Sequence, residues 1–407
     1  MIDEPVFASE PTRPGRRGDL RVQALAVAGA FLLNGVAFGT WAARIPAVKA
    51  QTGLDEAGLG FALLGASIGA VLTMVFGGAL GSRYGTHVIT PLTMIGCAAM
   101  MPVIGAAWDF ASLALALLVF GISQGTMDVC MNANGIAVER AGAGPIMSRL
   151  HACWSIGAFL GALASAQVAG LGIAVFPQFS VVGAAIALAG VVLLFTMLPD
   201  KHAEDEQHFR LPSGPLVLLG LLCLFGLMAE GSAMDWSGVY MQHTLDAPEG
   251  LAGLAVTAFA GSMALARLAG DRLAVSLGSR LLVVAGAALA AVGLGLALAV
   301  PVIPVAIAGF ALMGFGLAAV VPTLFRAAGS QPGVPASVGI AAVSTMGYSG
   351  GLIGPPLIGS VAAATSLRTS LAIVLVLLAI LALGARRALA PRSTSGSRGP
   401  SPIPPTV

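Results

Sequence analysis

Long apolar segments are the feature that most constrains the fold of this chain. Twelve segments of about 20–30 residues follow one another between short polar breaks, and about 20 helical residues span the ~30 Å core of a bilayer. Charged residues make up only 9% of the 407 residues, whereas soluble domains carry about 25%. The sequence therefore predicts an all-α membrane protein with twelve transmembrane helices. The predicted spans are 21–47, 57–81, 86–107, 110–138, 147–171, 175–198, 214–242, 250–272, 280–300, 302–326, 335–363 and 367–389.

The distribution of basic residues predicts the orientation. With a cytoplasmic N-terminus, every Lys and Arg except Arg44, Lys49 and Arg368 falls on the cytoplasmic side, as the positive-inside rule requires. We expect a multi-pass protein of the cell (inner) membrane with both termini in the cytoplasm. A net charge of +2 without a basic patch excludes nucleic-acid binding as the main role.

An internal repeat divides the chain into two halves. Glycines of the fourth and fifth spans recur at a constant offset in the tenth and eleventh, and Asn34-Gly35 recurs as Glu230-Gly231. Two six-span halves related by a repeat are typical of secondary transporters. The expected parts are a disordered N-terminus (1–20), a first half (21–198), a cytoplasmic linker (199–213), a second half (214–389) and a disordered tail (390–407).

The loops that follow the second and eighth spans carry a family pattern. Residues 78–87, GALGSRYGTH, resemble the G-x-L-x-D-R-x-G-R-R loop of the major facilitator superfamily, with Ser82 where the family has Asp. The second copy keeps the acid, and the resemblance implies that its charges hold the eighth span against the eleventh during conformational change. The residues assigned to these loops are Gly81, Arg83 and Gly85 in the first copy and Arg267, Asp271 and Arg272 in the second.

Longer strings narrow the resemblance. The strings 41–46 (WAARIP), 128–132 (DVCMN), 147–151 (MSRLH) and 235–237 (DWS) are similar to those of the MosC/YbjJ-like group, which resembles fucose-permease-type sugar symporters. The resemblance implies transport of a sugar, polyol or amino-sugar by alternating access. Proton:drug antiporters of the superfamily usually carry Gly-Pro in the fifth span, and here it falls in the eleventh, at Gly354-Pro355. A proton-driven drug or metabolite exporter stays open as the alternative.

Two acids lie near the middle of predicted spans, where an ionisable side chain costs at least ~2.5–3.5 kcal/mol and is a functional candidate by default. Asp128 lies about 16 Å from the cytoplasmic end of its span at 1.5 Å per residue. It forms a polar stripe with Gln124 and Asn132, one turn away on either side. Glu230 has a similar depth in the seventh span. We expect both acids to couple protons or bind solute; the alternative is a neutral acid hydrogen-bonded between helices.

Other residues extend this site. Asn34 matches Glu230 in the repeat and is expected to face the same cavity, unless it only joins helices through hydrogen bonds. Trp154 and Tyr348 can stack on a sugar ring.

Gates are predicted at both ends of the helices. Arg44 and Asp235 have opposite charge and comparable depth, which predicts an outer gate; alternatively, each caps its own helix end or meets lipid headgroups. Arg149 and His151 begin the fifth span on the cytoplasmic side. His151 is a candidate for proton release, with packing or an inner gate as the alternative.

The expected function is that of a secondary transporter for a small polar solute, with protons as the coupling ion and sodium as the alternative. An enzyme would need paired catalytic acids or a metal-ligand cluster on loops, and the sequence shows no such pattern. A channel would not need the six-plus-six repeat. Neither an enzyme nor a channel is therefore expected. Four cysteines without a CxxC pair predict no disulfide or zinc site. No cofactor or metal is expected, and a monomer suffices for this fold.

Overall fold

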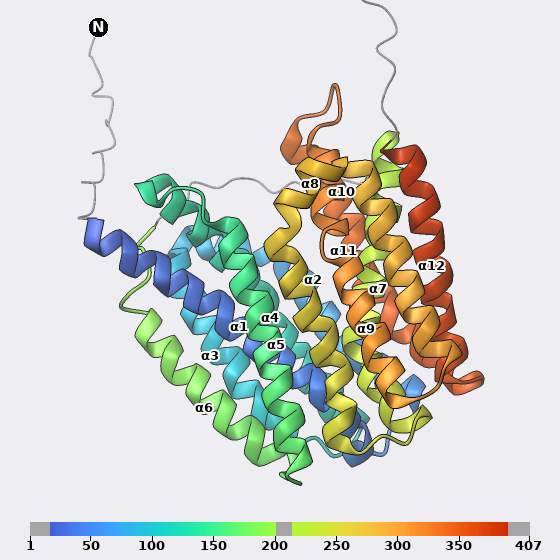
Figure 1. Ribbon diagram of the computed structural model, residues 1–407. Helices are drawn as coiled ribbons and strands as arrows, with labels where there is room; N and C mark the ends of the chain where they lie inside the picture. The colour runs from blue at the N-terminus through green and yellow to red at the C-terminus, as the bar shows by residue number, and fades with distance from the viewer. Residues whose placement is uncertain (1–16, 201–213, 390–407) are drawn as a thin grey trace, which may run out of the picture.

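The computed structural model describes residues 17–200 and 214–389, without the side chains of 17–18, 74–75, 269–275 and 337. Within this part the chain forms helices and no strands (Figure 1). The helices are α1 (Arg17–Thr52), α2 (Glu56–Tyr84), α3 (Thr86–Gly105), α4 (Phe110–Val138), the π-helical turn η1 (Glu139–Ala143), α5 (Met147–Gly170), α6 (Val175–Leu193), α7 (Pro215–Thr244), α8 (Glu249–Ala299), α9 (Ile303–Leu317), α10 (Val320–Gly329), α11 (Ala336–Ala364) and α12 (Leu367–Ala388).

The predicted all-α membrane fold is confirmed. Among the described residues, 11 helical stretches are long and apolar enough to cross a membrane. Two of them lie in α8, which bends at Gly278 with φ 74°, a conformation that glycine adopts without steric cost. α9 and α10 together form one stretch. α11 has 29 residues and no charge, and thus has the length of a twelfth span.

The predicted start of the first span differs from the structure. α1 begins at Arg17, four residues before the predicted start, because the polar residues preceding the apolar segment continue the same helix. Residues 17–20, expected to be disordered, are therefore helical. Residues 1–16, the linker beyond Asp200 and the tail from 390 lie outside the described residues.

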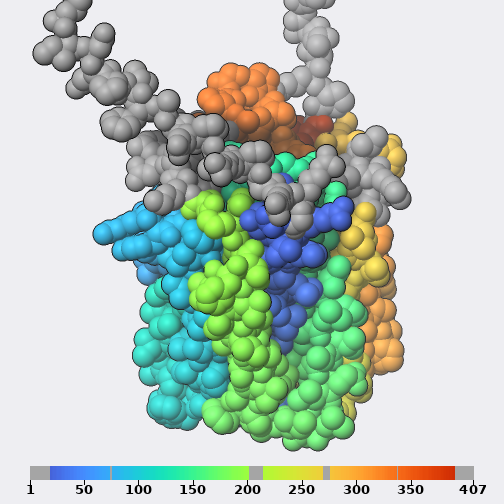
Figure 2. Space-filling view, turned by 90° about the vertical axis from the view of Figure 1, so that its left-hand side faces the viewer, coloured from blue at the N-terminus to red at the C-terminus, as the bar shows by residue number. Residues whose placement is uncertain are grey.

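The helices pack in two groups with the same internal pairing. In the first group α1 packs on α5, α2 on α4 and α3 on α6; in the second, α7 packs on α11, α8 on α9 and α12 on α8. Figure 1 shows the two groups side by side, and Figure 2 shows the outer face of the first, where α6 runs between α3 and α1. Across the groups α2 packs against α11 and α5 against α8.

The two groups approach each other most closely at one end, here called the closed end. A Cβ atom at Gly60 would lie 2.4 Å from the Pro355 carbonyl oxygen, and one at Gly250 would lie 2.7 Å from the Gly170 Cα. Only glycine permits such backbone contact. These positions fall where α2 and α8 begin and α5 and α11 end.

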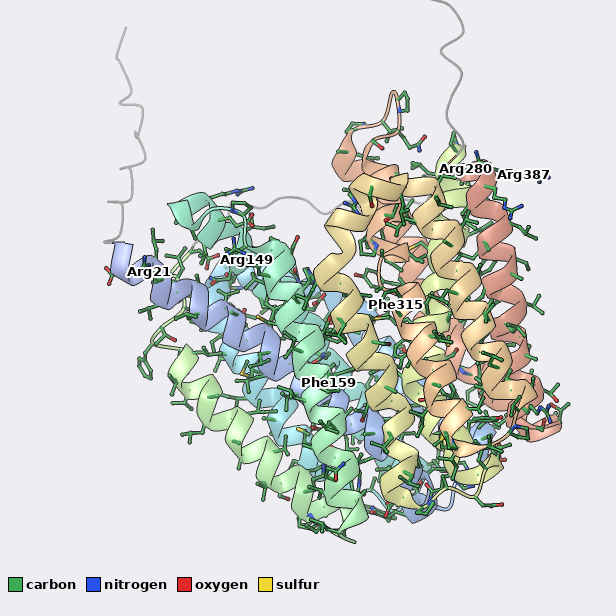
Figure 3. All side chains as sticks on the ribbon, viewed as in Figure 1. Arg21, Arg149, Phe159, Arg280, Phe315 and Arg387 are labelled. Carbon is green, nitrogen blue, oxygen red and sulfur yellow. The ribbon has the colours of Figure 1, made fainter. Side chains whose placement is uncertain are left out.

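The opposite end of the molecule is rich in arginine and is called the arginine end. It carries the start of α1 and the end of α12 (Figure 1). Figure 3 shows four arginines along this edge, from α1, α5, α8 and α12. They are Arg21, Arg149, Arg280 and Arg387.

Candidate functional site

A cavity of about 210 Å³ lies between the two groups of helices. Its walls come from α1, α5, α7, α8 and α11, and most of the lining side chains are apolar or aromatic. The polar groups that face it include Glu230 and Ser155. The structure therefore brings together three predicted residues from different helices, Trp154, Glu230 and Tyr348.

One wall of the cavity is backed by a cluster of side chains that we call the amide cluster, made of Asn34, Gln124 and Trp154. The Asn34 and Gln124 amides donate to each other, with N···O distances of 3.1 and 2.9 Å. Trp154 Nε1 donates to Asn34 Oδ1 at 2.7 Å. Asn34 is only 3% exposed. Three residues that the sequence placed on separate spans thus form one buried and well-bonded network.

A second set of polar groups, the charged pair, joins Arg267 of α8 to Glu230 of α7. Arg267 Nη2 lies 3.4 Å from Glu230 Oε1. Arg267 Nη1 donates to Ser155 Oγ on α5 at 2.9 Å, so this arginine bridges the two groups of helices. The Arg267 and Glu230 side chains are 22% and 19% exposed. Both are therefore open to exchange of partners.

The position of Arg267 corrects a prediction. The resemblance implied a charge relay in the loop after the eighth span, whereas the Arg267 side chain contacts a cavity-lining acid. The reason is that a long arginine side chain carries its charge well away from its own Cα. Asp271 and Arg272, assigned to the same relay, have side chains outside the described residues.

The polar stripe predicted on α4 serves two separate contacts. Gln124 belongs to the amide cluster. Asn132 Nδ2 instead donates to the backbone and side-chain oxygens of Asp128, at 2.8 and 3.2 Å. Asp128 is not among the residues that line the cavity, but its charge and that of Glu230 both act on Tyr348. Asp128 itself is half-buried.

At the closed end, Arg44 is buried and contacts two groups. Its Nη2 donates to the Ile173 carbonyl at 2.8 Å and lies 3.9 Å from Glu249 Oε1 on α8. No ion pair joins Arg44 to Asp235 within the described part of the chain, although both had been expected to form the outer gate. Glu249 takes this place because it is the first residue of α8 and lies at the closed end, whereas Asp235 lies inside α7.

At the arginine end, the first turn of α5 holds both predicted residues. Arg149 Nη2 lies 3.4 Å from the Pro145 carbonyl. The His151 ring meets the edge of Phe31, with ring centroids 5.3 Å apart, and the charge of Arg267 acts on His151. His151 therefore lies between the charged pair and the arginine end.

The loop between α2 and α3 turns sharply at the same end. Gly85 has φ 90° and its N–H donates to the Gly81 carbonyl. The Arg83 guanidinium lies 5.2 Å from the centre of the Tyr84 ring. Ser82, at the position of the family acid, donates to the Ala79 carbonyl of its own helix.

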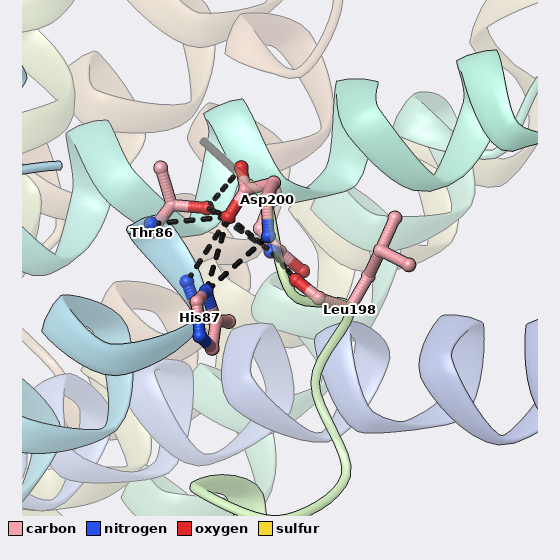
Figure 4. A network of polar contacts seen from close by, with 5 residues as sticks. Thr86, His87, Leu198 and Asp200 are labelled. Carbon is pink, nitrogen blue, oxygen red and sulfur yellow. Dashed lines mark hydrogen bonds and ion pairs between the residues drawn. The ribbon is translucent and has the colours of Figure 1, made fainter. Parts of the chain in front are cut away.

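A carboxylate missed by the sequence analysis meets the start of α3 (Figure 4). Asp200 accepts hydrogen bonds from the Thr86 and His87 backbone N–H groups and from the Thr86 hydroxyl. An acid is stabilised at a helix N-terminus, where N–H groups lack partners. Asn134 Nδ2 also donates to the Thr86 hydroxyl and to the Leu198 carbonyl. Asp200 has no motif around it, so only the folded chain reveals this contact.

Comparisons with known proteins agree with this architecture. A family model described as Major Facilitator Superfamily matches residues 216–406. An uncharacterised MFS-type transporter of Yersinia pestis is 34% identical, covering 88% of this chain and 93% of that protein. Membrane protein MosC of Rhizobium meliloti is 31% identical, covering 88% of each.

Solved structures share the fold. A bacterial homolog to the human lysosomal transporter Spinster, in an inward-facing and occupied conformation, matches with a TM-score of 0.75 at 16% identity, covering 92% of this chain and 98% of that one. The nucleoside transporter NupG matches with a TM-score of 0.74 at 12% identity, covering 90% and 99%. Two membrane-spanning groups of helices around a central cavity, together with these relatives, make the chain a member of the major facilitator superfamily, a multi-pass membrane transporter.

Proposed function

We propose that this transporter moves a small polar solute, such as a sugar, polyol or amino-sugar, together with protons. The observation that carries the proposal is the charged pair, because Glu230 lines the cavity, is partly exposed and directly contacts the cation Arg267. Protonating Glu230 would remove its attraction for Arg267. A proton can drive a conformational change only if it binds the two access states differently. Arg267 also donates to Ser155 of the opposite group, so release of Arg267 from Glu230 would act on a contact between the groups.

The rest of the cavity suits a polar ring. Trp154 and Tyr348 line it from α5 and α11, and aromatic faces pack on the apolar faces of sugars while their polar edges hydrogen-bond. Its volume of about 210 Å³ is below the about 300–1,000 Å³ typical of sites for drug-sized ligands. These features favour a small solute.

Alternating access would use the two groups of helices as moving bodies that divide at the linker, residues 199–213. We place the arginine end in the cytoplasm, because basic residues gather there (Figure 3). The closed end then faces outward, with Arg44 and Glu249 as its ion pair across the groups.

Proteoliposomes with an internal pH dye test this proposal. Polyols, sugars and amino-sugars are added one at a time to wild type, Glu230→Gln and Asp128→Asn. We expect solute-dependent acidification in wild type and its loss in Glu230→Gln. Acidification that persists in Glu230→Gln but not in Asp128→Asn would move the coupling site to Asp128. A wild type that never acidifies would contradict proton symport of these solutes.

One observation favours a second function. Most of the cavity wall is apolar, with Phe38, Phe259, Met234 and Met263 among its residues, and such a surface would also accept an apolar drug or metabolite. An exporter would confer resistance to apolar or cationic toxins on cells that produce it. Resistance without uptake of any polar solute would favour the exporter.

A further inference from the structure

We infer that the solute carries one negative charge, a carboxylate on a polyhydroxylated skeleton, and that Arg267 binds this carboxylate in exchange for Glu230. The inference rests on the proposed proton symport and names the solute class for the same cavity. It assigns Arg267 a direct role in solute binding.

The contacts of Glu230 allow such an exchange. Among the described residues, its carboxylate makes one polar contact, to Arg267 Nη2 at 3.4 Å. Hydrogen bonds between a guanidinium and a carboxylate are commonly about 2.7–2.9 Å long, so this pair is loose. Both side chains are partly exposed. The two groups that Arg267 contacts, Glu230 and Ser155, line the cavity, so a carboxylate that enters beside Glu230 could reach Arg267.

Charge balance favours the exchange. When Glu230 takes up a proton, the guanidinium of Arg267 loses its charge partner while its other described contact, Ser155, is neutral. An unpaired charge within a membrane protein is costly. A neutral sugar leaves that charge unpaired, whereas a monoanion restores the balance with a single carboxylate.

The other neighbouring titratable side chains within the described part of the chain do not supply this negative charge. His151 faces Arg267 from α5 and is neutral or positive. Tyr348 comes from α11, and Asp128 of α4 acts on Tyr348 while its own Oδ1 accepts from Asn132. Among the side chains that the structure describes, Glu230 is thus the acid in contact with Arg267, and an anionic solute is a group that can replace it.

Matched pairs of solutes test the inference directly. Gluconate and sorbitol differ in one terminal group, a carboxylate against a hydroxymethyl, and galacturonate and galactose differ in the same way. Each is added to proteoliposomes that contain a pH dye, with wild type, Arg267→Gln, Arg267→Lys and Arg386→Gln. Arg386 is exposed in the last turn of α12 and serves as the control for loss of one arginine.

We expect gluconate or galacturonate to acidify wild-type liposomes at least tenfold faster than its neutral partner. Arg267→Gln should abolish this response, Arg267→Lys should keep it with weaker apparent affinity, and Arg386→Gln should match wild type. Acidification by sorbitol or galactose but by neither acid would overturn the inference and leave the proposed function standing. Silence toward all four solutes would overturn both.

A binding measurement on wild type covers the case in which Arg267→Gln fails to fold. The thermal midpoint of purified wild type is measured with each solute at pH 5.5 and pH 7.5. The acid that is transported should raise the midpoint, and should do so more at pH 5.5, because proton and carboxylate bind together. A rise with the neutral partner alone, or a larger rise with the acid at pH 7.5, would contradict the inference.

Discussion

The dipeptides Asn34-Gly35 in α1 and Glu230-Gly231 in α7 occupy matching places in the repeat, yet their surroundings differ. A Cβ atom at Gly35 would lie 2.1 Å from the Trp154 carbonyl oxygen, whereas one at Gly231 would have nothing within 4 Å. Asn34 is buried in a bonded cluster. Glu230 and Gly231 line the cavity.

This difference distinguishes the two sides of the cavity. The amide cluster on the first side serves as a fixed wall, whereas the charged pair on the second side can change its contacts on protonation. In the first group of helices, neutral amides satisfy one another and hold α1, α4 and α5 together. In the second, a loose ion pair contacts the cavity and the opposite group at once. Matching positions in the repeat have therefore taken different roles, and the following variants test that division.

The largest expected effect is on packing. Gly35→Ala should destabilise the fold by about 1–3 kcal/mol or more, since overpacking forces backbone shifts, and here the atom in the way belongs to the backbone. Gly231→Ala, the matched control, should leave the thermal midpoint near that of wild type. Thermal unfolding of both variants in detergent checks this, and equal midpoints would remove the distinction between the two walls.

The next effect concerns the polar groups beside these glycines. Asn34→Ala removes the partner of Gln124 and Trp154, and an unpartnered buried polar group costs about 1–3 kcal/mol. Glu230→Gln should cost less, because Glu230 and Arg267 are partly exposed. The comparison uses the same thermal assay. A lower thermal midpoint for Glu230→Gln than for Asn34→Ala would show that the charged pair stabilises the fold more than the amide cluster does.

A smaller effect is expected at the closed end. Arg44 is buried, but the Glu249 side chain is 38% exposed and lies 3.9 Å away. Because one partner reaches solvent and the contact is long, we expect the pair to contribute close to the ~0–1 kcal/mol of surface pairs. Glu249→Gln should therefore open this end by at most about fivefold. A cysteine placed at buried Ala252 reports this as faster labelling by an impermeant maleimide, with Glu56→Gln as the control for loss of an acid at this end. Unchanged labelling would exclude Glu249 from the gate.

The smallest effect concerns the start of α4, the helix that carries Gln124. Asp109 caps this helix, and hydrogen bonds with the side chain and backbone of Ser112 hold the pKa of Asp109 below its ordinary value. A lowered pKa in the folded state stabilises at pH values above the ordinary pKa, and this contribution is lost as the pH falls through the lowered pKa. Asp109→Ala should lower the thermal midpoint slightly at pH 7 and make no difference in strong acid. A deficit that is equal at every pH would contradict capping by the ionised side chain.

Much of the fold follows from the sequence alone. Apolar length predicts the membrane helices, and the depth of Asn34, Trp154 and Glu230 along them predicts that they share the centre of the molecule. Depth along a helix does not say how far a side chain reaches. The sequence pattern therefore predicts that Arg267 acts in the loop, whereas its side chain contacts Glu230. Depth along a helix also does not give the tilt between helices. The sequence therefore predicts Asp235 as the partner of Arg44, whereas the structure places Glu249 beside it.

Contacts at helix ends were the least accessible to prediction. Asp200 meets the start of α3 from a segment far along the chain, and neither hydropathy nor repeat symmetry links the two. The fold brings them together because α3 packs on α6. Asp200 follows the end of α6 and therefore lies near the start of α3.

The central claim is that the charged pair couples protons while the amide cluster serves as the fixed wall. Comparing exchange with accumulation tests this most directly. Proteoliposomes containing Glu230→Gln should exchange labelled solute across the membrane without a gradient at rates near wild type. The same vesicles should fail to accumulate solute when a proton gradient is imposed. Gradient-driven accumulation by Glu230→Gln equal to that of wild type would contradict the account.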